Sequence, residues 1–193
     1  NIILLGLKSK QLKFNDIKKE INFFKNKILK YVDRISPVLM NAKLKSQKVL
    51  FEGAQGILLD VEHGTYPFVT SSSTIPSNAS SGSGVPVKQI GFILGIVKAY
   101  TTRVGSGPFP SELKNKIGEK LGTIGNEFGT VTGRQRRCGW FDAVIVKYSI
   151  NISGIDGIAL TKLDVLDTFK EIKICIGYKL NGKKIDHFPS TEF

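Results

Sequence analysis

Strand-like and helix-like segments alternate along most of this sequence, and the alternation limits the choice of fold more than any other property. Short apolar runs at 48–52 and 157–160 predict buried strands, each followed by a glycine-rich or polar turn. Strands that alternate with helices favour an α/β fold in which much of the sheet is parallel. We therefore predict a mostly parallel central sheet flanked by helices.

Five helices are predicted. The first covers 15–33, where Ile17, Ile21 and Phe24 begin a helical repeat that Asn15 can cap. The second, 36–45, begins at Ser36-Pro37, because proline is tolerated in the first turn of a helix. The others are expected at 86–100, 115–124 and 141–150.

The last feature of the predicted fold is an antiparallel hairpin. Residues 172–178 alternate between isoleucine or tyrosine and other residues, which is typical of a half-buried strand. Asn181-Gly182 then supplies the turn that two-residue hairpins prefer. The 193 residues suit one domain, or a large piece of a bigger one.

The net charge of +12 favours a polyanionic partner, although a surface rich in lysine gives the same charge. The sequence contains no apolar run of eighteen residues, so it predicts no membrane-spanning helix. Cys138 and Cys175 form neither a disulfide framework nor a zinc-binding pattern, which favours a reducing cytoplasmic setting. The first residue is not methionine, and we expect the sequence to begin inside a longer reading frame.

Thr161-Lys162-Leu163-Asp164 is the first candidate binding motif, because it follows a predicted strand. A carboxylate at Asp164 can accept hydrogen bonds from N1–H and the amino group of guanine, a pattern that adenine lacks. Lys162 can lay its aliphatic stem over the purine. The alternative is a structural salt bridge at the end of the strand.

The second candidate is the basic loop 129–137, which carries Arg134, Arg136 and Arg137 between small and hydroxyl residues. Guanidinium groups match carboxylates and phosphates because two N–H groups meet two oxygens. Gly129 and Gly133 would let the loop move or approach a ligand closely. The same loop can also be read as an exposed charge cluster or a nucleic-acid patch.

A third candidate region begins at Gln55, which lies between glycines after the predicted strand 48–52. His63, near Asp60 and Glu62, suggests a metal ligand or a general base, but its spacing favours a structural histidine. The polar stretch 70–84 is either a linker or a ligand-binding loop. The sequence has no Gly-x-x-x-x-Gly-Lys-Ser/Thr phosphate loop and no nucleophile–histidine pattern, and no metal site is predicted.

Taken in order, six segments resemble adenylosuccinate synthetase from about Lys48 to Tyr178. They are Phe-Glu-Gly-Ala-Gln-Gly (51–56), His-Gly-Thr-Tyr-Pro-Phe-Val-Thr-Ser-Ser (63–72), Lys-Ala-Tyr-Thr-Thr-Arg-Val-Gly-Ser-Gly-Pro-Phe-Pro (98–110), Asn-Glu-Phe-Gly (126–129), Thr-Gly-Arg (132–134) and Thr-Lys-Leu-Asp-Val-Leu-Asp (161–167). The resemblance implies an incomplete P-loop NTPase-like synthetase fold, with 1–193 as a partial single domain. It also implies a ligase of de novo AMP synthesis that joins L-aspartate to IMP with GTP.

In the family's reaction, GTP phosphorylates the 6-oxygen of IMP, and the amino group of aspartate then displaces that phosphate. The resemblance implies that Gln55 contacts the 6-oxygen as negative charge develops there, in the manner of an oxyanion hole. Thr70 would hold the IMP phosphate. Val104 would line the ribose through its backbone.

The resemblance also implies that residues 130–136 form a mobile loop for aspartate. Its contacts would be Thr130, Val131, Thr132, Gly133, Arg134 and Arg136. Arg134 would also reach the IMP ribose, and Arg136 would bridge towards the GTP phosphates. Lys162 and Asp164 would read guanine.

The chain departs from the family at Val131, Gln135 and Ser77-Asn78. It also lacks the family's Gly-Asp-Glu-Gly-Lys-Gly-Lys loop, which supplies a catalytic aspartate and the Mg²⁺ site, and the histidine that acts as general acid. The resemblance implies a cytoplasmic homodimer and predicts that this piece alone cannot turn over. A degraded relative that keeps only nucleotide-binding surfaces is the alternative. A nucleic-acid-binding module would leave Asp164 without a role.

Overall fold

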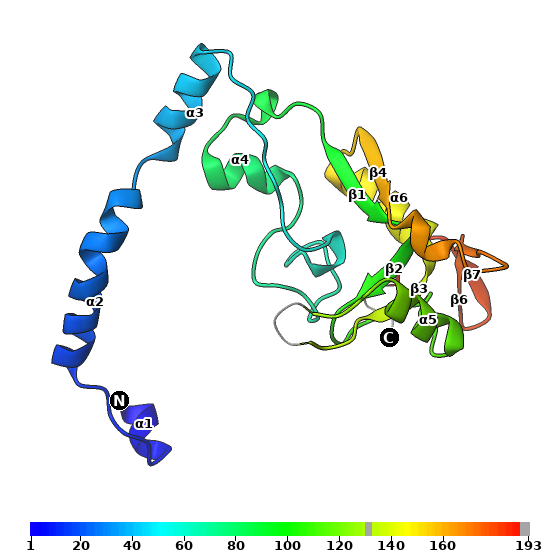
Figure 1. Ribbon diagram of the computed structural model, residues 1–193, viewed down its shortest axis with the longest axis horizontal. Coiled ribbons are helices and arrows are strands. Elements are labelled where there is room, and N and C mark those ends of the chain that lie inside the picture. The colour runs from blue at the N-terminus through cyan, green and yellow to red at the C-terminus, as the bar shows by residue number, and fades with distance from the viewer. Residues whose placement is uncertain (130–132, 190–193) are drawn as a thin grey trace. The chain divides into compact units, whose positions relative to one another are not determined.

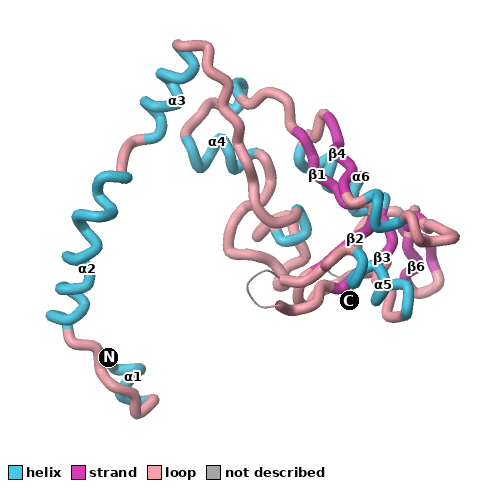
Figure 2. The backbone as a smooth tube through the Cα atoms, in the orientation of Figure 1, coloured by secondary structure: helices cyan, strands magenta, loops and turns pink. Residues whose placement is uncertain are grey.

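The computed structural model describes residues 1–129 and 133–189. The chain forms two compact units, Asn1–Val49 and Leu50–Phe193. Figure 1 gives the element labels, and Figure 2 separates helices, strands and loops by colour. Among the described residues, no helix is long and apolar enough to cross a membrane.

The first unit is helical. It contains α1 (Ile2–Gly6), α2 (Phe14–Ile28), the 3-10 turn η1 (Leu29–Tyr31) and α3 (Ile35–Leu44). The predicted helices 15–33 and 36–45 are thus confirmed, but the predicted cap is wrong. Helix α2 begins at Phe14 with Lys13 at its N-cap, so Asn15 lies inside the first turn. No residue of these helices is buried.

The second unit is a mixture of strands and helices. Strand β1 (Leu94–Lys98) pairs in parallel with β4 (Gly157–Thr161). Strand β3 (Arg137–Asp142) lies between β2 (Tyr100–Arg103), antiparallel to it, and β5 (Ile174–Cys175), parallel to it. Strands β6 (Tyr178–Leu180) and β7 (Lys183–Ile185) form a hairpin around Asn181-Gly182. These findings confirm the α/β fold, with a parallel sheet, flanking helices and an antiparallel hairpin.

Three α-helices accompany these strands in the second unit. They are α4 (Ser77–Ser83), α5 (Lys116–Ile124) and α6 (Ala143–Ser153). Helix α5 packs against β3, and Asn115 caps it by accepting bonds from the N–H groups of Ile117 and Gly118. Asp142 caps α6 in the same way. Helix α6 begins two residues later than the sequence predicts, since 141 and 142 belong to β3.

The predicted helix 86–100 is wrong. The structure has a 3-10 turn, η3 (Val87–Gln89), followed by β1 and the start of β2. All five residues of β1 pair with β4, from Leu94 with Gly157 to Lys98 with Thr161. The backbone bonds of this parallel ladder, and the β-branched Ile96 and Val97, outweigh the helical spacing of the apolar residues.

The predicted strand 48–52 is also wrong, because these residues have no strand assignment and Leu50 is 89% exposed. A strand needs a hydrogen-bonded neighbour, and no described segment pairs with this one. The strand 157–160 is confirmed, although Ile158 and Leu160 are each 45% exposed rather than buried. The expected strand 172–178 divides into β5 and the start of β6. The polar stretch 70–84 contains α4 rather than loop alone.

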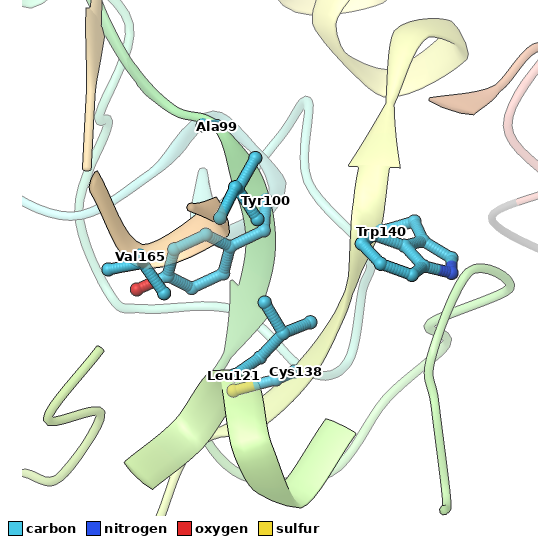
Figure 3. Close-up of a cluster of buried hydrophobic side chains, with 7 residues drawn as sticks. Ala99, Tyr100, Leu121, Cys138, Trp140 and Val165 are labelled. Atoms are coloured by element: carbon cyan, nitrogen blue, oxygen red, sulfur yellow. The ribbon is translucent and has the colours of Figure 1, made fainter. Parts of the chain in front are cut away.

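The main hydrophobic core lies where β2, β3, α5 and the 3-10 turn η4 (Leu163–Leu166) meet. It consists of Ala99, Tyr100, Leu121, Cys138, Trp140, Val165 and Leu166. Figure 3 shows the Tyr100 ring among these side chains. Because Val165 and Leu166 belong to it, this core fixes the chain immediately after the Thr-Lys-Leu-Asp motif.

Candidate functional site

A fully buried carboxylate, Glu127, collects basic side chains from distant parts of the sequence. Lys98 donates to both of its oxygens at 2.9 and 2.8 Å, and Arg136 donates to Oε2 at 2.8 Å. Lys162 forms an ion pair with Oε1 at 3.4 Å, and the Tyr100 hydroxyl donates to the same oxygen at 2.6 Å. We call these five residues the Glu127 cluster.

The electrostatics of the Glu127 cluster favour a charged carboxylate. Burial acts to raise the pKa of Glu127, but the hydrogen bonds from Lys98, Tyr100 and Arg136 outweigh it and lower the pKa to about 2. Burial and the neighbouring Glu127 raise the pKa of Tyr100 well above its usual range, so its hydroxyl remains a donor. Three cations around one anion leave an excess of positive charge suited to an anionic ligand.

The cluster lies at the carboxyl ends of two parallel strands. Lys98 is the last residue of β1, and Lys162 follows the last residue of β4. The carboxyl ends of parallel strands are where open α/β sheets bind their ligands. The Nζ group of Lys162 also donates to the carbonyl of Gly125, which fixes this side chain against the end of α5.

The three residues that the resemblance assigns to GTP therefore lie near one another. Arg136 and Lys162 both contact Glu127. Asp164 has an exposed side chain, and its charge adds to the effects of burial and of Glu127 in raising the pKa of Tyr100. Asp164 is accordingly close to the cluster and open to a ligand.

A second buried carboxylate, Asp60, organises the loop 60–74. Its oxygens accept hydrogen bonds from the backbone N–H groups of Glu62, His63 and Thr74 and from the Ser73 hydroxyl. Burial opposes ionisation, but these four bonds hold the pKa of Asp60 well below its usual range. The loop they stabilise includes Thr70, the proposed contact to the IMP phosphate.

Arg103 ties this loop to the next glycine-rich loop. Its buried guanidinium donates to the Thr65 hydroxyl at 2.6 Å, to the Phe68 carbonyl at 3.1 Å and to the Ser106 carbonyl at 3.1 Å. Gly107 has φ +106°, and a Cβ there would lie 2.4 Å from Arg103 Nη2. Only glycine allows this close approach.

Arg137 holds the other side of the same loop. It forms a two-pronged pair with Glu112, at 2.7 and 2.6 Å, and donates to the carbonyls of Gly105 and Gly107 at 3.1 and 2.9 Å. Val104 therefore lies between two anchored residues with its side chain 52% exposed. Such a fixed loop suits the predicted backbone contact to a ribose.

Two proposed ligand contacts have a left-handed backbone that is uncommon outside glycine. Gln55 has φ +62° and Lys162 has φ +57°. Non-glycine residues in this region are strained and are often found at functional sites. Gln55 is exposed, and among the described residues no hydrogen bond or ion pair joins it to the Glu127 cluster.

The predicted arginine loop has a closed base. The N–H of Arg136 donates to the Glu127 carbonyl, and the N–H of Gly129 donates to the Arg134 carbonyl, both at 2.8 Å. Gly133 has φ +63°. Thr130, Val131 and Thr132 lie outside the described residues. Arg134 and Arg136 both lie on the arm that returns from this loop, two residues apart.

The backbone of His63 is held at both of its polar groups. Its backbone carbonyl accepts from the Tyr148 hydroxyl at 2.7 Å, and its backbone N–H donates to Asp60. Among the described residues, no group of three His, Cys, Asp or Glu side chains could hold a metal ion.

Sequence reasoning missed the residues that hold the site together. Glu127 was noted only as part of a motif, and Lys98, Tyr100 and Arg103 were given no role. The available signal was that all four lie inside the motif segments 98–110 and 126–129. A buried acid and buried arginine need partners, but the sequence does not say which ones.

The fold and these two networks define an α/β protein that presents cations and loops to anionic ligands at the ends of its parallel strands. The family model for adenylosuccinate synthetase matches residues 2–193, and the chain belongs to this family. The expected family is therefore confirmed.

The solved structures that are similar to this chain include two synthetases. One is a fully ligated adenylosuccinate synthetase from Plasmodium falciparum, with 44% identity and a TM-score of 0.81. The match covers 91% of this chain and 43% of that one, so the chain spans less than half of its relative. The other is the succinoaminodeoxyadenylate synthetase of cyanophage S-2L bound to dGMP and dATP, with 24% identity, a TM-score of 0.55 and coverage of 79% and 48%. This second likeness supports the fold alone.

Proposed function

We propose that the protein carrying this chain ligates L-aspartate to IMP with GTP, giving adenylosuccinate, GDP and phosphate. The observation that carries the proposal is the Glu127 cluster within a chain of this family. It gathers Arg136 and Lys162, both expected at GTP, and adds positive charge at the strand ends.

The reaction has two steps. The γ-phosphoryl group of GTP moves to the 6-oxygen of IMP, so that the bond to GDP breaks and a P–O bond forms. The aspartate amine then attacks C6, and the phosphate leaves with the 6-oxygen. Gln55 would hold the 6-oxygen while negative charge develops on it, a role that its fixed left-handed backbone supports.

The IMP pocket would be built on the Asp60 and Arg103 contacts. Thr70 would bind the IMP phosphate, because its loop is fixed at Asp60 and its own N–H donates to the Leu59 carbonyl at 2.8 Å. Val104 would line the ribose through its backbone. Arg134 would meet both the ribose and aspartate.

The aspartate site would be the loop 130–136, with Thr130, Val131, Thr132, Gly133, Arg134 and Arg136. Arginine forks favour the two carboxylates of aspartate. Arg136 would also bridge towards the GTP phosphates, while Lys162 and Asp164 would select guanine over adenine. The carboxylate of Asp164 would accept from both N1–H and the amino group.

The remaining properties are also proposals. We infer a cytoplasmic homodimer whose 193 residues here form part of one domain. Mg²⁺ would be held by residues outside this chain and would neutralise the phosphate charge of GTP. This chain's own contribution would be to bind and orient IMP, aspartate and guanine.

The proposal is tested in the full-length protein by measuring adenylosuccinate formation by chromatography, with IMP, aspartate and GTP as substrates. Product should require all three, and ATP should not replace GTP. Asp164→Asn should weaken the preference for GTP over ATP, since one acceptor becomes a donor. Nucleotide binding without product would instead support a degraded relative.

A further inference from the structure

The Glu127 carboxylate cannot itself reach a ligand, but its partners can. The side chain of Glu127 is 0% exposed, whereas those of Lys98, Arg136 and Lys162 are 27%, 30% and 38% exposed. Each basic side chain therefore has one end bound to a common buried anion and some surface left to contact another group. Glu127 therefore holds the three basic side chains from the buried side, while their exposed surface can contact a ligand.

The backbone of Glu127 is fixed as firmly as its side chain. Its N–H donates to the Gly122 carbonyl of α5, and its own carbonyl accepts from Arg136, both at 2.8 Å. Glu127 thus closes the base of the arginine loop with its backbone and holds Arg136 with its carboxylate. Any shift of Glu127 would move the loop that carries the proposed aspartate contacts.

The same carboxylate also reaches the other proposed substrate region. Lys162 follows β4 and lies two residues before Asp164, the proposed guanine reader. Its ion pair with Glu127 fixes a residue whose backbone is left-handed, at φ +57°. One side chain therefore joins the start of the arginine loop to the strand end that carries the guanine contacts.

We propose that Glu127 is a positioning residue that couples the GTP site to the aspartate loop by holding Arg136 and Lys162 on one carboxylate. The inference rests on the proposed function and deepens it. Lys98 of β1 and Tyr100 of β2 also donate hydrogen bonds to the Glu127 carboxylate and so help to hold it in place.

A selective effect on substrates follows from the separation of the two networks. The IMP region is held by Asp60, Arg103 and the Arg137–Glu112 pair. No described hydrogen bond or ion pair of Asp60, Arg103 or Glu112 involves Glu127. Loss of the Glu127 charge should therefore disturb the binding of GTP and aspartate more than that of IMP, for which only the proposed contact of Arg134 lies on the loop that Glu127 holds.

The test compares steady-state constants of Glu127→Gln with wild type in the full-length protein. Glutamine keeps the shape but loses the charge that binds Arg136 and Lys162. We expect the KM values for GTP and aspartate to rise by roughly ten- to a hundred-fold, the usual effect of losing a hydrogen bond to a charged group. The KM for IMP should rise by less than about fivefold, since Gln55, Thr70 and Val104 keep their contacts and only Arg134 lies on the affected loop.

Glu112→Gln is the matched control. It removes a second, partly buried carboxylate that also pairs with an arginine, but at the loop holding Val104. It should raise the KM for IMP more than those for GTP and aspartate. If both variants change all three KM values alike, or change only kcat together with the folded fraction, the positioning role is refuted.

Tyr100→Phe is a second variant that tests the same role with little risk of unfolding the protein. It keeps the buried ring and removes only the 2.6 Å bond to Glu127 Oε1. We expect the KM values for GTP and aspartate to rise by roughly three- to ten-fold with the thermal unfolding midpoint little changed. A folded Tyr100→Phe variant with wild-type KM values would overturn the inference.

The outcome separates this inference from the proposed function. If the wild-type protein forms no adenylosuccinate from IMP, aspartate and GTP, the proposed function fails. If the wild type is active and the two variants show no selective change, the function stands and only the role of Glu127 falls.

Discussion

At the residue scale, the Glu127 carboxylate gives the protein a defined response to acid. Its folded pKa is about 2, below the ordinary value of 4.5. The stabilisation is therefore complete above pH 4.5 and is lost as the pH falls from 4.5 towards 2. The loss amounts to about 3 kcal/mol in the free energy of unfolding.

Urea unfolding of the wild-type protein at a series of pH values measures this loss. Glu127→Gln should be less stable at pH 7, yet its stability should change less between pH 4.5 and 2. Asp60 keeps its own acid dependence in both proteins, so the difference between the two curves isolates Glu127. Parallel curves would show that Glu127 is not a stabilising carboxylate.

Replacing Gln55 with glycine should lower the activity and relieve backbone strain. Replacing it with glycine relieves the left-handed conformation at φ +62°, while glycine loses more chain entropy on folding. These effects nearly cancel, so the free energy of unfolding should change by less than about 1 kcal/mol. Loss of the amide should lower kcat on the order of a hundred-fold, as for an oxyanion donor.

Asn181→Gly is the control for this substitution. Asn181 has a similar backbone, at φ +48°, but lies in the β6–β7 turn. Its kcat should equal that of the wild type. A Gln55→Gly variant as active as Asn181→Gly would remove Gln55 from the proposed mechanism.

At the scale of the elements, Arg103 determines whether the two loops of the proposed IMP pocket stay together. Arg103→Lys keeps the charge but cannot bridge Thr65, Phe68 and Ser106 at once, because lysine lacks the planar fork. The KM for IMP should rise roughly ten-fold, with smaller changes for GTP. Unchanged binding of IMP in calorimetry would contradict the arrangement.

The elements also show how far the sequence predicts the structure. Helices α2, α5 and the body of α6 follow from the local spacing of apolar residues, which a sequence displays directly, although the predicted cap of α2 is wrong. Strand β1 does not, because its apolar residues fit helix and strand alike and only pairing with β4, about sixty residues away, decides between them. The predicted strand at 48–52 is wrong for the opposite reason. Its composition is strand-like, but no segment of the described chain pairs with it.

The candidate site follows the same division. In the sequence, the chemical types of four residues suggest contacts to ligands, and the resemblance says which ligand each one contacts. These residues are Gln55, Arg136, Lys162 and Asp164. The residues that hold the site together could not be predicted in this way, because Glu127 contacts Lys98 and Tyr100 across 29 and 27 residues of sequence. A contact across that distance depends on the fold, so no local pattern predicts it.

At the scale of the whole molecule, the 193-residue chain alone should not ligate aspartate to IMP. The sequence contains no Gly-x-x-x-x-Gly-Lys-Ser/Thr phosphate loop, and among the described residues no group of three His, Cys, Asp or Glu side chains could hold a metal ion. Helices α1 to α3 bury no residue, and Ile21, Phe24 and Ile28 on α2 are 61%, 43% and 55% exposed. Exposed apolar area of this kind favours association, so the isolated chain should bind a hydrophobic dye and sediment as mixed species.

The assay for this prediction is phosphate release from GTP by the purified chain, with IMP and aspartate added singly and together. The full-length protein at equal concentration is the control, and it should release phosphate only when both substrates are present. The chain should show no such dependence, because its cationic cluster can hold anions but supplies no group to activate the 6-oxygen beyond Gln55. If the chain releases phosphate only when both IMP and aspartate are present, its residues suffice for catalysis. The proposal that residues outside this chain are needed for the reaction would then be wrong.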